Sequence, residues 1–128
     1  MAQHKASCVL LADRHHGVTE GVRGLLETLF DTVVMVADGP SLLESARRLQ
    51  PEVAVVDISL TRDASLRWLT ELRERVPDLK VIVLSVHDEP AVRRAAMDAG
   101  ADGFVLKRSI ATELLTTIES VSSGGHQI

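Results

Sequence analysis

The chain has 128 residues, which is enough for one domain and too short for two of ordinary size. Apolar residues make up 45% of it and aromatic residues 2%, so we expect a core of mainly aliphatic side chains. The formal net charge of -4, without any run of basic residues, argues against nucleic-acid binding by this chain, and the single cysteine excludes an internal disulfide. No apolar stretch approaches the ~18 residues of a membrane span and no signal-peptide core is present, so we expect a cytoplasmic protein without membrane contact.

Short apolar runs spread along the chain predict β-strands. The third and fourth runs are apolar at every position, which is typical of parallel strands whose two faces are both covered by helices. The five runs are 8–12, 33–37, 53–56, 81–84 and 104–106.

Amphipathic segments lie between and after these runs and predict five helices. Pro51 and Pro77 would follow the second and third helices, Gly100 is placed to end the fourth, and Ser109 can cap the start of the fifth. The apolar faces consist of Val18, Val22, Leu25 and Leu29; Leu42, Ala46 and Leu49; Leu66, Leu69, Leu72 and Val76; Val92, Ala95, Ala96 and Ala99; and Leu114, Leu115, Ile118 and Val121.

The alternation of strands and helices predicts a single α/β domain over residues 1–122. We expect a five-stranded parallel sheet in the order 2-1-3-4-5 with helices on both faces. Residues 123–128 are expected to form a flexible tail or the start of a linker. Ligands of such open sheets bind beyond the carboxyl ends of the strands, so the functional residues are sought there.

Chemically active side chains follow four of the predicted strands. Asp13, Asp57, Ser85 and Lys107 come after the first, third, fourth and fifth. Two close carboxylates raise each other's pKa unless a cation intervenes, and a hard divalent cation such as Mg²⁺ suits oxygen ligands. The ammonium and hydroxyl groups suit a phosphoryl group, which a carboxylate can accept as a nucleophile.

Each of these residues also has a simpler interpretation. Asp13 alone would more often cap the following helix, and Asp57 alone could equally be a turn residue. Ser85 could bond to backbone, and most lysines, like Lys107, are surface charges. The recurrence of such residues at successive strand ends favours the functional interpretation.

Four segments carry a resemblance to a known family, and they span nearly the whole chain in order. The sequence resembles response-regulator receiver domains of two-component signalling, in particular the branch with LuxR-type helix-turn-helix output domains. The stretch AMDAGADGFVLK is the most specific. The segments are LLADRHHGVTEGVRGLLE (10–27), PEVAVVDISL (51–60), VIVLSVHDEPAVRRAAMDAGADGFVLK (81–107) and SIATELLTTIESVSSG (109–124).

The resemblance implies the flavodoxin-like receiver fold and a role for each residue at the strand ends. Asp57 would be the phosphoacceptor of a histidine kinase or phosphotransfer protein, and Asp13 would help to bind Mg²⁺. Ser59 would supply a backbone carbonyl to the metal. Ser85 and Lys107 would bind the phosphoryl oxygens. Phe104 would be an aromatic switch that responds to Ser85.

The sequence departs from the family pattern at the metal site. The family usually has two adjacent acids after the first strand, and the second binds the metal directly. Arg14 stands in that place, so Mg²⁺ binding is expected to be weak or absent. Smaller departures at Thr61, Ser65 and Val86 affect loop shape or crowd the acceptor.

Three functions are compatible with these features. The first is a phosphorylatable receiver that switches a partner or an output domain outside this chain, in transcription regulation. The second is an atypical receiver, an interaction module without Mg²⁺-dependent phosphorylation, in which Arg14 pairs with Asp57 or points to solvent. The third, an enzyme or nucleotide-binding protein on the same fold, is disfavoured because no glycine-rich phosphate motif follows a strand.

The histidines and the possible oligomeric state do not distinguish between these functions. His15 and His16 are interpreted as a solvated pair because adjacent loop residues rarely bind one ion. His87 is interpreted as an exposed loop residue, although the family's residue at this position can influence loss of the phosphoryl group. A homodimer is left open, and the family's usual contact face is formed by the fourth helix, fifth strand and fifth helix.

Overall fold

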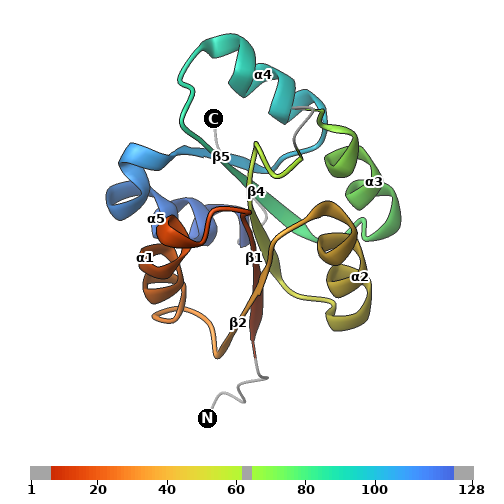
Figure 1. Cartoon of the computed structure of the whole chain (residues 1–128), viewed down its shortest axis with the longest axis vertical. Helices are drawn as coiled ribbons and strands as arrows, with labels where there is room; N and C mark the ends of the chain where they lie inside the picture. The colour runs from red at the N-terminus through yellow and green to blue at the C-terminus, as the bar shows by residue number, and fades with distance from the viewer. Residues whose placement is uncertain (1–6, 62–64, 123–128) are drawn as a thin grey trace.

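The computed structural model describes residues 7–61 and 65–122, apart from the side chains of residues 16–19, so the predicted tail at 123–128 lies outside it. Strands and helices alternate along the described chain (Figure 1). The elements are β1 (Cys8–Ala12), α1 (His16–Leu26), β2 (Thr32–Val36), α2 (Gly39–Leu49), β3 (Val53–Asp57), α3 (Arg67–Arg75), β4 (Lys80–Ser85), α4 (Pro90–Asp98), β5 (Gly103–Leu106), a 3-10 turn (Lys107–Ser109) and α5 (Ile110–Ser122).

The strands form one parallel sheet in the order β2-β1-β3-β4-β5, which confirms the predicted topology. Helices α1 and α5 cover one face, and α2, α3 and α4 cover the other (Figure 1). The core therefore has two halves, one on each side of the sheet.

Successive side chains of β3 and β4 point alternately into the two halves of the core. In β3, Val53 and Val55 pack toward α1 and α5, whereas Ala54 and Val56 pack toward α2 and α3. All five residues of β3 are buried. This two-sided burial is the physical reason why the third and fourth apolar runs have no polar position.

The first helix is shorter than its apolar pattern predicted. It ends at Leu26, and Leu29 is 38% exposed, so the expected position of Leu29 on the buried face is wrong. Phe30 fills the core at this end instead. The end of α4 agrees with the prediction, because Gly100 follows it with φ of +118°, a conformation that favours glycine.

The carboxyl ends of the inner strands meet at one edge of the sheet. Asp57 is the Cα partner of Leu84, and Ser85 is the partner of Leu106, so the residues that follow these strands lie close together. Within the described ranges, no helix is long and apolar enough to cross a membrane.

Candidate functional site

Three of the predicted residues form one cluster of charges at this edge. The Lys107 Nζ lies 2.7 Å from Asp57 Oδ2 and 3.3 Å from Asp13 Oδ2, so one ammonium group bridges two carboxylates. Both acids are 3% exposed, and the Lys107 side chain is 14% exposed. The fold places them because Asp13 follows β1, Asp57 ends β3 and Lys107 follows β5.

The bridge determines the charge state of the site. Burial alone would raise the pKa of Asp57, but the hydrogen bond from Lys107, the Ser59 N–H and the charge of Lys107 hold that pKa below its ordinary value. Burial likewise opposes the charge on Lys107, but the two carboxylates outweigh it and raise the pKa of the ammonium group. Asp57 is therefore ionised at neutral pH, which is the form of a carboxyl group that can act as a nucleophile.

The loops after β1 and β3 hold the other oxygens of the two acids. Asp57 Oδ1 accepts hydrogen bonds from Ser59 N at 3.0 Å and from Ser59 Oγ at 3.2 Å. Asp13 Oδ1 accepts a bond from His15 N at 2.8 Å. These bonds fix the orientation of both carboxylates, whereas the metal-binding role of the Ser59 carbonyl remains a prediction.

Ser85 lies at the same strand edge but is bonded elsewhere. Its side chain is fully buried, and its Oγ accepts a bond from His87 N at 2.9 Å and donates to the His87 carbonyl at 3.1 Å. The side chain of His87 is exposed, as expected. In this arrangement the hydroxyl holds the β4–α4 loop, so it would have to turn to reach a group on Asp57.

Phe104 occupies an enclosed position beside this strand end. It pairs with Val83 of β4 in the sheet and is buried, and the guanidinium carbon of Arg93 lies 5.7 Å from the centre of its ring. A guanidinium group is attracted to the electron-rich face of an aromatic ring. Arg93 of α4 therefore packs against the ring of Phe104.

Arg14 follows neither of the two arrangements considered for it. No ion pair joins it to Asp57 among the described residues, where Lys107 is the cation that contacts this carboxylate. Arg14 is also not a fully solvated side chain, because it is partly buried and its Nε is enclosed without a hydrogen-bond partner.

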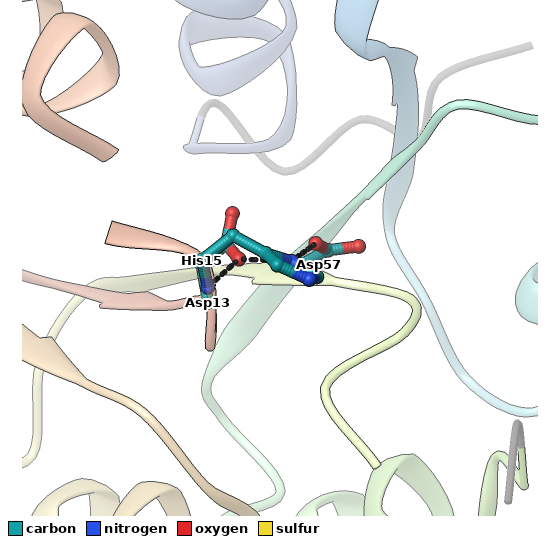
Figure 2. A group of neighbouring side chains, drawn as sticks. All are labelled: Asp13, His15 and Asp57. Atoms are coloured by element: carbon teal, nitrogen blue, oxygen red, sulfur yellow. Dashed lines mark hydrogen bonds and ion pairs between the residues drawn. The ribbon is translucent and has the colours of Figure 1, made fainter. Parts of the chain in front are cut away.

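His15 belongs to the cluster, which the sequence interpretation missed. Its Nδ1 lies 3.4 Å from Asp13 Oδ1 and 3.8 Å from Asp57 Oδ2, and the ring lies against both carboxylates (Figure 2). The His15 side chain is 56% exposed, so it contacts solvent as expected, but the rest of its surface lies against the two acids. Its position two residues after Asp13, at the same strand end, was the available signal.

The comparison with family models decides the classification. The model of the response regulator receiver domain matches residues 9–119. The chain belongs to this family. Similar proteins include the transcriptional regulatory protein DegU of Brevibacillus brevis, 31% identical over 94% of this chain and 52% of its own length. The nitrate/nitrite response regulator NarP of Escherichia coli is 34% identical over 91% of this chain and 55% of its own length.

Solved structures agree with this classification. A LuxR-family two-component response regulator from Aurantimonas sp. has a TM-score of 0.87 at 26% identity, covering 97% of this chain and 90% of that one. The receiver domain of the putative regulator NarL from Mycobacterium tuberculosis has a TM-score of 0.81 at 27% identity, covering 94% and 99%. The receiver fold is thus shared over nearly the whole chain, which spans about half the length of the curated relatives named above.

Receiver domains typically bind Mg²⁺ through acidic residues, and this site fits that ion poorly. It offers two carboxylates, Lys107 bridges them, and the position of the usual direct acid is held by Arg14. The third group that faces the acids is an imidazole rather than an oxygen ligand. Mg²⁺ prefers six oxygen ligands, so the donor set departs from its requirement.

Proposed function

We propose that this receiver domain accepts a phosphoryl group on Asp57 from a histidine kinase or phosphotransfer protein and thereby switches a partner or an output domain. The observation that carries the proposal is the contact of Lys107 with the buried carboxylate of Asp57 at the carboxyl edge of the sheet. An ionised carboxylate beside a fixed ammonium group supplies both a nucleophile and a binding group for the incoming charge.

The chemistry follows from the residues present. An oxygen of Asp57 would attack phosphorus while the phosphorus–nitrogen bond of the donor phosphohistidine breaks, and the leaving imidazole takes up a proton. Lys107 can remain bonded to the new group, because an ammonium has three donors. Ser85 would exchange its bonds with the His87 backbone for one to a phosphoryl oxygen.

The proposed output is regulation of transcription. DegU and MctR are each described as a transcriptional regulatory protein, and one similar structure is of RcsB in complex with DNA. These relatives are longer than the match, so a DNA-binding domain would lie in their remaining length. The acidic chain described here would act on such a domain rather than on DNA itself.

A second function is favoured by one observation. Lys107 already bridges Asp13 and Asp57, so the acid pair is partly neutralised without a metal ion. Together with Arg14, this supports an atypical receiver that acts as an interaction module and does not require Mg²⁺-dependent phosphorylation.

Phosphorylation by a small donor distinguishes the two functions. The protein is incubated with acetyl phosphate, with and without Mg²⁺, and its intact mass is measured. We expect a gain of one phosphoryl group that is slow and is abolished by Asp57→Asn, whereas the exposed control Asp88→Asn retains it. Absence of the gain with every donor and cation tested would favour the interaction module.

A further inference from the structure

We propose that the pocket between α2 and α3 binds a small uncharged molecule whose carbonyl oxygen accepts a hydrogen bond from the indole N–H of Trp68. The two helices lie side by side on the face of the sheet that α2, α3 and α4 cover (Figure 1). The proposal concerns the unphosphorylated chain and does not depend on the proposed phosphorylation of Asp57.

Trp68 carries a buried polar group without a partner. The residue is 3% exposed and its ring packs in the core beneath α2 and α3. Its Nε1 is enclosed and has no hydrogen-bond acceptor among the residues that the structure describes. An indole nitrogen can only donate, and a buried tryptophan N–H usually has a partner. An acceptor oxygen supplied by a ligand would therefore form a bond that the protein itself does not make.

The pocket beside Trp68 has the size and lining of a small-molecule site. Its volume is about 320 Å³, at the lower end of the range of about 300–1,000 Å³ for ligand pockets. Most of its surface is carbon, to which Pro40 and Leu43 of α2 contribute together with Trp68. A Cβ at Gly39 would lie 3.9 Å from Cγ2 of Thr61, which also lines the pocket, so the lack of a side chain there keeps this space open. Such a lining suits a compact apolar ring with one polar group.

The charges around the pocket favour an uncharged ligand over a phosphate or a carboxylate. Asp38, the N-cap of α2, carries a negative charge and already accepts a bond from Ser41 N at 2.8 Å. Pro40 in the first turn has no N–H to offer to an anion. On the α3 side, Arg67 and Glu71 have opposite charges, so together they add no net charge to the pocket.

The indole ring has to move slightly for the proposed bond to form. Nε1 of Trp68 is enclosed by neighbouring atoms, whereas the ring itself borders the open volume of the pocket. A small turn of the ring into this volume brings the N–H within about 2.9 Å of a ligand oxygen, the ordinary length of such a bond. Ligand binding should therefore change the surroundings of Trp68, which is the only tryptophan in the sequence.

NMR titration of the ¹⁵N-labelled chain with cyclohexanone and with δ-valerolactam tests the proposal, because a single indole N–H signal reports on the site. Gly39→Leu fills the pocket, and its matched control, Gly24→Leu, places the same side chain at an exposed position of α1 with open space around it. Trp68→Phe keeps an aromatic ring and removes the donor, and its affinity for cyclohexanone is measured by saturation transfer to the ligand protons. Thermal unfolding verifies that the variants are folded.

We expect both probes to move the indole proton signal downfield and saturably in the wild type and in Gly24→Leu, but not in Gly39→Leu. Trp68→Phe should bind cyclohexanone about fivefold more weakly, which corresponds to one hydrogen bond. If Trp68→Phe does not fold, the comparison of the wild type with the two glycine variants decides the question. The proposal would be overturned by a signal that does not move saturably with either probe, by an equal movement in Gly39→Leu, or by equal affinity of Trp68→Phe and the wild type.

Discussion

At the scale of single residues, Lys107 has the largest electrostatic role, because it is the cation shared by two buried acids. Lys107→Met should raise the pKa of Asp57 and destabilise the protein by about 3 kcal/mol at neutral pH, since it leaves uncompensated buried charge. Chemical denaturation measures the stability, and carboxyl ¹³C titration measures the pKa.

The pH dependence of this loss has a defined sign. In the wild type the lowered pKa of Asp57 contributes stability above the ordinary carboxyl pKa, and this contribution is lost as the pH falls through the folded-state pKa. In Lys107→Met the acids are relieved by protonation, so the difference between the two proteins should shrink as the pH falls. Lys80→Met removes the same charge at the opposite end of β4 and should show neither effect. A stability difference between the wild type and Lys107→Met that does not change with pH would contradict the electrostatic role of Lys107.

Arg14 is the second residue with a specific expected effect. Arg14→Asp should increase Mg²⁺ affinity at least about tenfold, or about 1.4 kcal/mol, because it removes a positive charge and adds an oxygen ligand. It should also speed phosphorylation by acetyl phosphate. Arg14→Ala separates the two causes, since it removes only the charge. Mg²⁺ affinity equal in all three proteins would show that Arg14 does not influence the acids.

At the scale of elements, Gly100 joins α4 to β5 under a steric constraint. Its φ is +118°, and a Cβ there would lie 2.6 Å from Cγ of Arg73, whose guanidinium bonds to Leu79 and Asp102. Gly100→Ala should therefore destabilise the fold by about 2 kcal/mol. Gly24→Ala, at an exposed position of α1 with open space around it, should stabilise the fold by about 0.5–1 kcal/mol. Equal effects in denaturation would refute this distinction.

The β4–β5 pair contains the proposed conformational switch. If Ser85 turns from the His87 backbone toward a phosphoryl group, the space beside β5 changes, and the ring of Phe104 should respond. Phosphorylation should change the Phe104 side-chain NMR signals and leave those of Phe30 unchanged, because Phe30 packs on the α1 and α5 side. Unchanged Phe104 signals in a demonstrably phosphorylated sample would exclude the switch.

At the scale of the whole molecule, the sequence predicted the sheet and its order because the uninterrupted apolar runs at 53–56 in β3 and 81–84 in β4 are a direct consequence of two-sided burial. It also predicted which residues follow the strands. It did not predict the end of α1, because Leu29 continues the helical spacing although the chain has already turned. Spacing also does not give the direction of a loop side chain, so His15 was assigned to solvent although its ring lies against two acids.

The proposed phosphoacceptor, Asp57, can be identified by locating the phosphoryl group on the chain. The protein is treated with a small phosphodonor, any acyl phosphate is reduced with borohydride, and peptide mass spectrometry locates the modified aspartate. We predict that the modification lies at Asp57 and is absent from Asp13, because Asp57 is the acid at the end of β3 that receives the closer bond from Lys107. Modification at Asp13, or at another acid with Asp57 intact, would contradict the assignment of Asp57 as the phosphoacceptor.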